Sequence, residues 1–149
     1  MRLFVDNLTN IDFSYLCPER GLVGETWLAH VQLEGTLDHQ GMICDFGVVK
    51  KKLRDWLDKT LDHCLLVPTK SNAIRCNTMD GITIVELTLP SDEYIQVESP
   101  QEAITLLDIS AVTPASTADW CMKQLQNVFG DGVATIHLSF SPEIIDTPY

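Results

Sequence analysis

The stretch Gly41-Met42-Ile43-Cys44-Asp45-Phe46-Gly47, followed by Leu61-Asp62-His63-Cys64-Leu65-Leu66, decides the fold of this chain. Asp45 is a typical helix N-cap, because its carboxylate can accept hydrogen bonds from the free N–H groups of the first turn. Side chains that recur every three or four positions then predict a helix with one apolar face: Phe46, Val49, Leu53, Trp56, Leu57 and Thr60. An acid and an imidazole, Asp62 and His63, follow where this helix ends.

The composition predicts a single folded domain over residues 1–149, with 45% hydrophobic and 21% charged residues. A net charge of −11 argues against nucleic acid and against an anionic membrane surface as partners. No apolar run approaches the roughly 20 residues of a membrane-spanning helix. The first residues include an acid too early for a signal-peptide core, so we expect a cytoplasmic protein whose five cysteines are reduced thiols.

Strand patterns precede the helix. Residues 2–6 and 11–16 are either two strands or one strand interrupted by polar residues, and residues 17–21 predict a turn. From Thr26 to Gly35 the side chains alternate, which is typical of a half-buried strand whose inner face holds Trp27, Ala29, Val31 and Leu33.

The second half of the chain contains a hairpin, a helix and a last strand. Asp80-Gly81 predicts the hairpin turn, and Thr113-Pro114 predicts an N-cap followed by the first residue of a helix that Gly130 to Gly132 would end. The other expected elements are strands at 73–76, 82–89, 94–97 and 133–140, a loop at 68–72 and a short helix at 100–107. This order favours an α+β fold with an antiparallel sheet and helices on one face.

The two quoted motifs, with Val49-Lys50 in the helix, resemble the 6-pyruvoyl/6-carboxy tetrahydropterin synthase family. Residues 13–16 and 22–35 lie where that family has its metal-bearing strands. The resemblance implies the tunnelling fold, in which a four-stranded antiparallel sheet carries two helices on one face. It also implies a homo-oligomer joined through sheet edges, and here a β-hairpin insertion at about 71–111.

The resemblance further implies a lyase-type conversion of dihydroneopterin triphosphate, in pterin or deazapurine biosynthesis, with zinc as cofactor. The zinc histidines of the family would fall at Cys17, Val23 and Glu25, so those histidines are not present in this chain and its cofactor stays unknown. By the same resemblance, Thr113 and Glu143 are candidates for binding a pterin-like substrate, Glu143 only after a shift of register.

Asp62 and His63 are the candidate catalytic pair, since an acid can orient an imidazole that acts as general acid or base. The alternative is structural, because a histidine at a helix C-terminus interacts well with the helix dipole. His30 and His137 could form a metal pair across the sheet, with His63 as a third ligand, or simply face the sheet surface.

Two functions therefore remain open. One is an enzyme with the reaction of the family, active alone or as the front half of a longer enzyme whose missing ligands lie elsewhere. The other is a catalytically degenerate tunnelling-fold module for pterin or purine binding, or for assembly.

Overall fold

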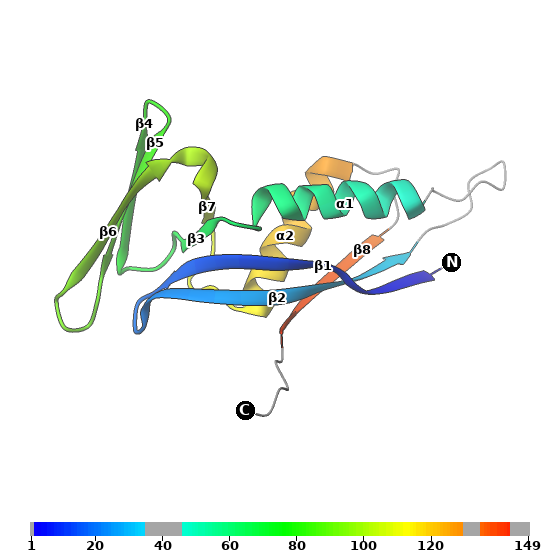
Figure 1. Cartoon of the computed structure of the whole chain (residues 1–149), viewed down its shortest axis with the longest axis horizontal. Helices are drawn as coiled ribbons and strands as arrows, with labels where there is room; N and C mark the ends of the chain where they lie inside the picture. Colours follow the sequence, from blue (N-terminus) through cyan, green and yellow to red (C-terminus); the bar gives the residue numbers. More distant parts are fainter. Residues whose placement is uncertain (1, 35–45, 130–134, 144–149) are drawn as a thin grey trace.

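The computed structural model describes residues 2–34, 46–129 and 135–143, and Figure 1 shows the arrangement of their elements. The main sheet has five strands in the order β7-β3-β1-β2-β8. Its long strands are β1 (Arg2–Cys17), β2 (Gly21–Glu34) and β8 (Thr135–Pro142), and its short ones are β3 (Leu65–Pro68) and β7 (Ile104–Leu107). The helices are α1 (Phe46–Thr60) and α2 (Pro114–Phe129). The expected Asp45 cap and the helix stop at Gly130 to Gly132 lie outside the described residues.

The first two predicted strands are one strand, β1, which is interrupted by a bulge. Val5 pairs with Val31 and Thr9 with Ala29, so three residues of β1 lie opposite the single residue His30 of β2. Asn7, in the middle of the bulge, has a φ of 57°. Its backbone N–H donates to Nδ1 of His30 over 3.2 Å, which supplies the partner that the ladder no longer provides.

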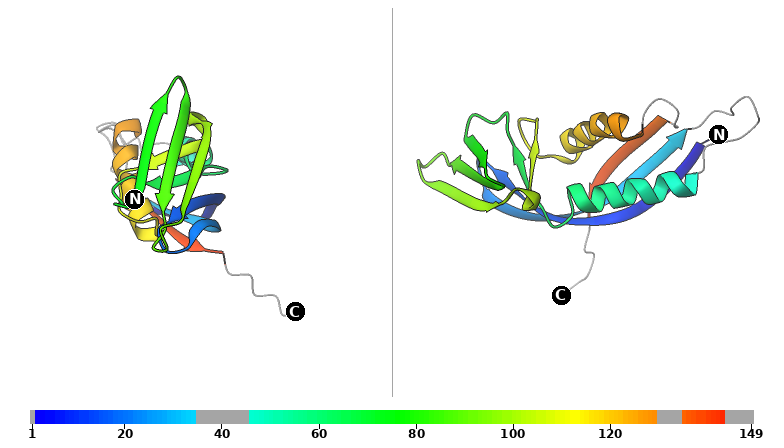
Figure 2. Two further views of the ribbon diagram at one scale, coloured as in Figure 1. Left: turned by 90° about the vertical axis from the view of Figure 1, so that its left-hand side faces the viewer. Right: turned by 90° about the horizontal axis from the view of Figure 1, so that it is seen from above.

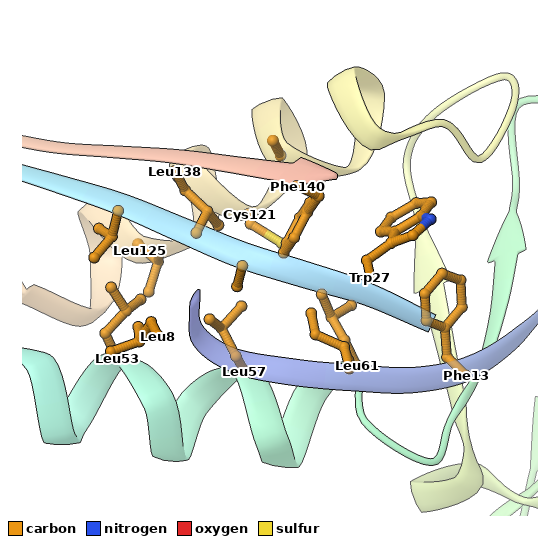
Figure 3. Packing of buried hydrophobic residues seen from close by; sticks show 14 of the residues in the cluster. Leu8, Phe13, Trp27, Leu53, Leu57, Leu61, Cys121, Leu125, Leu138 and Phe140 are labelled. Atoms are coloured by element: carbon orange, nitrogen blue, oxygen red, sulfur yellow. The ribbon is translucent and has the colours of Figure 1, made fainter. Parts of the chain in front are cut away.

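Both helices cover one face of the β1-β2-β8 part of the sheet, as predicted. The inner face of β2 holds Trp27, Ala29, Val31 and Leu33, all buried. Figure 3 shows buried side chains of α1 (Leu53 and Leu57) and of α2 (Cys121 and Leu125) packed in the core beneath these strands. All of these side chains come from positions that the periodicity predicted to be buried. This core is therefore the part of the fold that the sequence predicts most directly.

The start of α2 confirms the predicted cap. Thr113 Oγ1 accepts the backbone N–H of Ser116 over 3.0 Å, and Ser116 Oγ accepts the backbone N–H of Thr113 over 3.0 Å. Pro114 occupies the first helical position, where its missing N–H costs nothing. This reciprocal pair satisfies two backbone donors at the helix entrance.

The main sheet differs from the expected antiparallel four-stranded one, because β3 and β7 add to it in parallel. The predicted helix at 100–107 is wrong beyond a single 3-10 turn at Gln101–Ala103, since β7 follows it. Strand β3 is buried on both sides, with Leu66 in the helix-covered core and Leu65 and Val67 in a second core. A strand buried on both faces shows no alternation, which is why the pattern did not predict it.

The insertion is a three-stranded antiparallel sheet rather than a hairpin: β4 (Ile74–Met79), β5 (Ile82–Thr88) and β6 (Tyr94–Pro100). Asp80 and Gly81 have φ values of 55° and 79°, as a two-residue type I′ turn requires, so the predicted turn is confirmed. Figure 2 shows this sheet at one end of the molecule. It covers the second core, which consists of Leu16, Leu65, Val67, Ile74, Val85, Leu87 and Ile104.

A candidate ligand pocket at the Asp62–His63 junction

The end of α1 is fastened to the middle of β1 through the backbone of one residue, Asp12. Its N–H donates to Oδ1 of Asp62 over 2.9 Å, and its carbonyl accepts the N–H of His63 over 2.7 Å. One residue further along, the carbonyl of Cys64 accepts the N–H of Ser14 over 3.1 Å. The residues Asp62 to Cys64, here called the junction, are therefore fixed in position before β3 begins.

His63 carries the exposed functional group of the junction. Its Nε2 lies 3.3 Å from Oδ2 of Asp62, so this carboxylate binds β1 with one oxygen and the imidazole with the other. The side chain of His63 is 79% exposed, whereas that of Asp62 is 19% exposed. His63 also has a φ of 59°, a left-handed conformation that costs an L-residue roughly 1–2 kcal/mol. Strain of this kind is often found at functional sites.

A pocket of about 540 Å³ opens beside His63. Three segments that are far apart in sequence form its walls: the β1–β2 hairpin, the junction with the start of β3, and the end of the insertion with β7. The lining residues are Asp12, Phe13, Ser14, Leu22, His63, Cys64, Leu65, Val97, Ser99, Ala103 and Ile104. The wall from the insertion was not predicted, because no local pattern indicates that β6 lies against the junction.

The three positions that the family resemblance assigned to zinc do not fit a metal. Val23 has no ligating atom and is buried. Cys17 pairs with Gly21, so Glu25 lies four residues further along β2, about 13 Å away at the usual rise of a strand. The Sγ of Cys17 instead donates to Glu19 over 3.3 Å. A zinc site needs about three converging ligands, and the described residues hold no group of three or more histidine, cysteine or acidic side chains that could bind a metal.

Tyr15 lies near all three of these positions. It pairs with Val23 across the hairpin, and its ring lies 6.1 Å from that of Phe13. Burial raises the pKa of Tyr15, and the neighbouring Arg20 opposes that rise. This part of the hairpin is therefore an aromatic surface with one cation beside it.

The two predicted substrate-binding residues do not line the pocket. Thr113 caps α2, as described above. The backbone N–H of Glu143 donates to the carbonyl of Thr26 over 2.9 Å, and Thr26 Oγ1 donates to Oδ1 of Asp12 over 2.6 Å. Glu143 thus lies two hydrogen bonds away from the pocket residue Asp12. A substrate contact by either residue stays a prediction.

His30 and His137 lie at a different place from His63. They line a hollow of about 230 Å³ on the sheet face opposite the helices. His30 accepts the N–H of Asn7 at Nδ1, so its Nε2 carries the proton and donates to Oγ of Ser141 over 2.7 Å. Both ring nitrogens of His30 are therefore used to hold β1, β2 and β8 together, which favours the structural alternative for this histidine.

The fold defined by these elements is an α+β domain with two helices on one face of its main sheet, and comparisons with known proteins agree with it. The family model described as 6-pyruvoyl tetrahydropterin synthase matches residues 15–143. This chain belongs to the 6-pyruvoyl tetrahydropterin synthase family. The predicted family and its tunnelling fold are thereby confirmed.

A curated relative and two solved structures illustrate the similarity. A Pyrococcus abyssi protein named "Putative 6-carboxy-5,6,7,8-tetrahydropterin synthase" is 27% identical over 128 residues, which is 86% of this chain and 73% of that protein. A catalytic-residue mutant of the Plasmodium vivax 6-pyruvoyltetrahydropterin synthase superposes with a TM-score of 0.71 at 17% identity, over 95% of this chain and 90% of that one. The Plasmodium falciparum enzyme has a TM-score of 0.68 at 16% identity, with the same coverage. Both structures are similar in fold.

Proposed function

We propose that this chain binds a pterin or purine-like ring in the pocket beside His63, as a binding module of pterin or deazapurine biosynthesis that holds no zinc of its own. The observation that carries the proposal is the Asp62–His63 pair, which is fixed to β1 at the edge of the pocket. A heterocycle suits this pocket, because its walls are largely apolar and a few polar groups are placed among them.

The contact between the imidazole and Asp62 suggests how His63 could meet a ligand. Oδ2 of Asp62 lies 3.3 Å from Nε2 of His63, so a neutral imidazole with its proton on Nε2 would face this carboxylate and leave Nδ1 as an acceptor. A ring N–H of a ligand can donate to that Nδ1, and Asp62 stabilises the imidazolium if a proton is transferred. Leu22, Val97 and Ile104 supply apolar contact for the flat faces of a ring.

Thermal unfolding with neopterin tests this function. A ligand at 100 times its dissociation constant stabilises a protein by about 2.7 kcal/mol, which corresponds to a rise in Tm of about 5 °C or more for a domain of this size. We expect that rise for the unmodified chain and for His137→Ala, whose histidine is exposed outside the pocket. His63→Ala should lose most of it. Absence of any rise in the unmodified chain at saturating neopterin would reject pterin binding.

The family reaction is a second candidate, and the same acid–imidazole pair favours it. A lyase-type conversion of dihydroneopterin triphosphate would use His63 as the proton-transfer group, oriented by Asp62. Since Cys17, Val23 and Glu25 do not fit zinc, no metal step is assigned to this chain. Product formation by the purified chain, lost in His63→Ala and kept in His137→Ala, would establish the reaction. No product with or without added zinc would exclude it.

The proposal also includes a homo-oligomeric state and a cytoplasmic location. Strands β7 and β8 form the two edges of the main sheet, and pairing of such edges between copies would give a homo-oligomer. The described cysteines, Cys17, Cys64, Cys76 and Cys121, are free thiols, which supports a cytoplasmic location. None of the helices in the described residues is long and apolar enough to cross a membrane. Sedimentation analysis would test the oligomer, and a monomer at all concentrations would contradict it.

A further inference from the structure

Helix α1 concentrates positive charge in a chain whose net charge is −11. Five of the ten lysine and arginine residues of the chain lie on this helix, together with two acids. One of those acids, Asp58, contacts β1, where its Oδ1 accepts a hydrogen bond from Thr9 Oγ1 over 3.2 Å. Four of the cations are exposed and are here called the basic strip: Lys51, Lys52, Arg54 and Lys59.

One edge of the insertion carries the opposite charge. From Ser91 to Glu102 the chain has four acids and neither lysine nor arginine. All four are exposed, and they follow strand β6 from the turn before it to the 3-10 turn after it: Asp92, Glu93, Glu98 and Glu102, here called the acidic strip. Since β6 is an edge strand of the three-stranded sheet, this strip lies at a border of the insertion.

The two strips belong to different parts of the molecule. Figures 1 and 2 show the insertion sheet at one end, whereas α1 lies alongside the long strands of the main sheet. The elements that carry the strips are similar in length, about 22 Å for the 15 residues of α1 and about 23 Å for the seven residues of β6. A contact along the whole of both strips therefore joins two copies of the chain.

Each strip also has an exposed apolar or aromatic side chain beside its charges. Val48 is 61% exposed and precedes Lys52 by four positions, so both lie on one face of α1. Tyr94 is 67% exposed and shares a face of β6 with Glu98, since side chains alternate along a strand. Aromatic rings are enriched in interfaces, and they attract lysine and arginine.

We infer that α1 docks against the β6 edge of a second copy of this chain, with the basic strip on the acidic strip. A second copy suits the basic strip better than a nucleic acid does, because the net charge of −11 repels phosphates. The two surfaces differ, so the contact is head to tail and its repetition gives a ring or an open chain. It goes beyond the proposed function and does not depend on ligand binding.

Sedimentation analysis in two salt concentrations tests this contact. At about 0.1 M salt the Debye length is about 10 Å, so charges in contact attract while the repulsion between whole molecules is screened. We expect association that strengthens with protein concentration there and is about tenfold weaker or more at about 1 M salt. Pairing through β7 and β8 would not respond in this way, because those strands contain no lysine, arginine or acid. No association, or association that salt leaves unchanged, would overturn the inference.

Charge reversal on each strip gives a sharper test. One variant carries Lys51→Glu and Arg54→Glu, and the other carries Glu93→Lys and Glu98→Lys. Each variant alone should lose the salt-sensitive association, because both of its strips then have the same sign. An equal mixture of the two variants should recover it, since each reversed strip fits the other. A mixture that does not associate, or a single variant that associates as well as the unmodified chain, would contradict the inference.

A control variant separates the strip from charge in general. Lys123→Glu makes the same change of charge at an exposed position on α2 and should leave the association unchanged. Glutamate and lysine have similar helix propensities, so both helix variants should keep their circular dichroism. An equal loss of association in Lys123→Glu would overturn the assignment to α1. Binding of the unmodified chain to anionic vesicles, without self-association, would assign the basic strip to a membrane surface and overturn the inference as well.

Discussion

Two regions of the same β1–β2 hairpin differ in how firmly they hold their functional groups: the part around Asp12, here called the junction end, and the part from Cys17 to Glu25, here called the turn end. At the junction end, one carboxylate and two backbone groups of Asp12 hold His63 at the edge of a pocket. At the turn end, Cys17, Val23 and Glu25 are spread along the two strands, and Tyr15 pairs with Val23. Hydrogen bonds to the backbone are enough to position a single side chain such as His63. A metal site needs about three ligands at once, so it is lost when one of them is replaced.

The largest effect that separates the two ends should come from Asp62→Ala. This change leaves the N–H of Asp12 without its carboxylate acceptor and removes the partner of His63. We expect the free energy of unfolding to fall by about 1.5–3 kcal/mol, the range for a hydrogen bond to a charged group. Urea denaturation measures it. Asp62→Asn keeps an acceptor oxygen and should cost less than half as much; equal costs would show that the Asp12 contact is unimportant.

Two thiols also differ in burial: Cys17, at the turn end, is partly exposed, whereas Cys121 is buried in the core. Burial raises the pKa of Cys121 far above its usual range. The folded protein therefore keeps this proton while the unfolded chain releases it above about pH 8.5. Stability is full below that pH and should fall above it by about 1.4 kcal/mol per pH unit. Unfolding measured from pH 7 to 10 should show this loss, and Cys121→Ala should remove that part of it.

The backbone of His63 offers a smaller test of whether the junction serves a function. Glycine adopts its left-handed conformation at no steric cost, so His63→Gly should raise the free energy of unfolding by up to about 1 kcal/mol. The same variant should lose neopterin binding. Asp92→Gly, at an exposed position with a φ of 69°, is the matched control and should keep binding. A destabilised His63→Gly would mean that the histidine side chain is needed for folding.

The smallest effect is expected at the turn end. Glu25→Gln removes a charge from a position that the structure does not join to a metal site, and substitutions of this kind usually change stability by less than about 0.5 kcal/mol. Neopterin binding should be unchanged as well. A loss of binding in Glu25→Gln, measured by calorimetry, would show that the turn end still takes part in the site.

Local sequence patterns predicted those parts of the molecule whose structure is set by residues close together in the chain. Thr113 and Pro114 specified the start of α2, Asp80 and Gly81 specified a turn, and the alternation from Trp27 to Leu33 specified an inner face. Strands β3 (Leu65–Pro68) and β7 (Ile104–Leu107) were missed, because both are short and β3, buried on both faces, shows no alternation. The sequence indicated His63 but not the pocket wall from Val97 and Ser99, because only the tertiary fold brings that wall to the histidine.

The central claim is that the junction pocket binds a pterin ring without help from a zinc ion. Calorimetric titration of neopterin into the purified chain, before and after treatment with a metal chelator, tests it most directly. We predict binding with the same dissociation constant in both preparations, and its loss in His63→Ala. Binding that disappears on chelation and returns with added zinc would contradict this account, because it would require a metal site that Cys17, Val23 and Glu25 do not form.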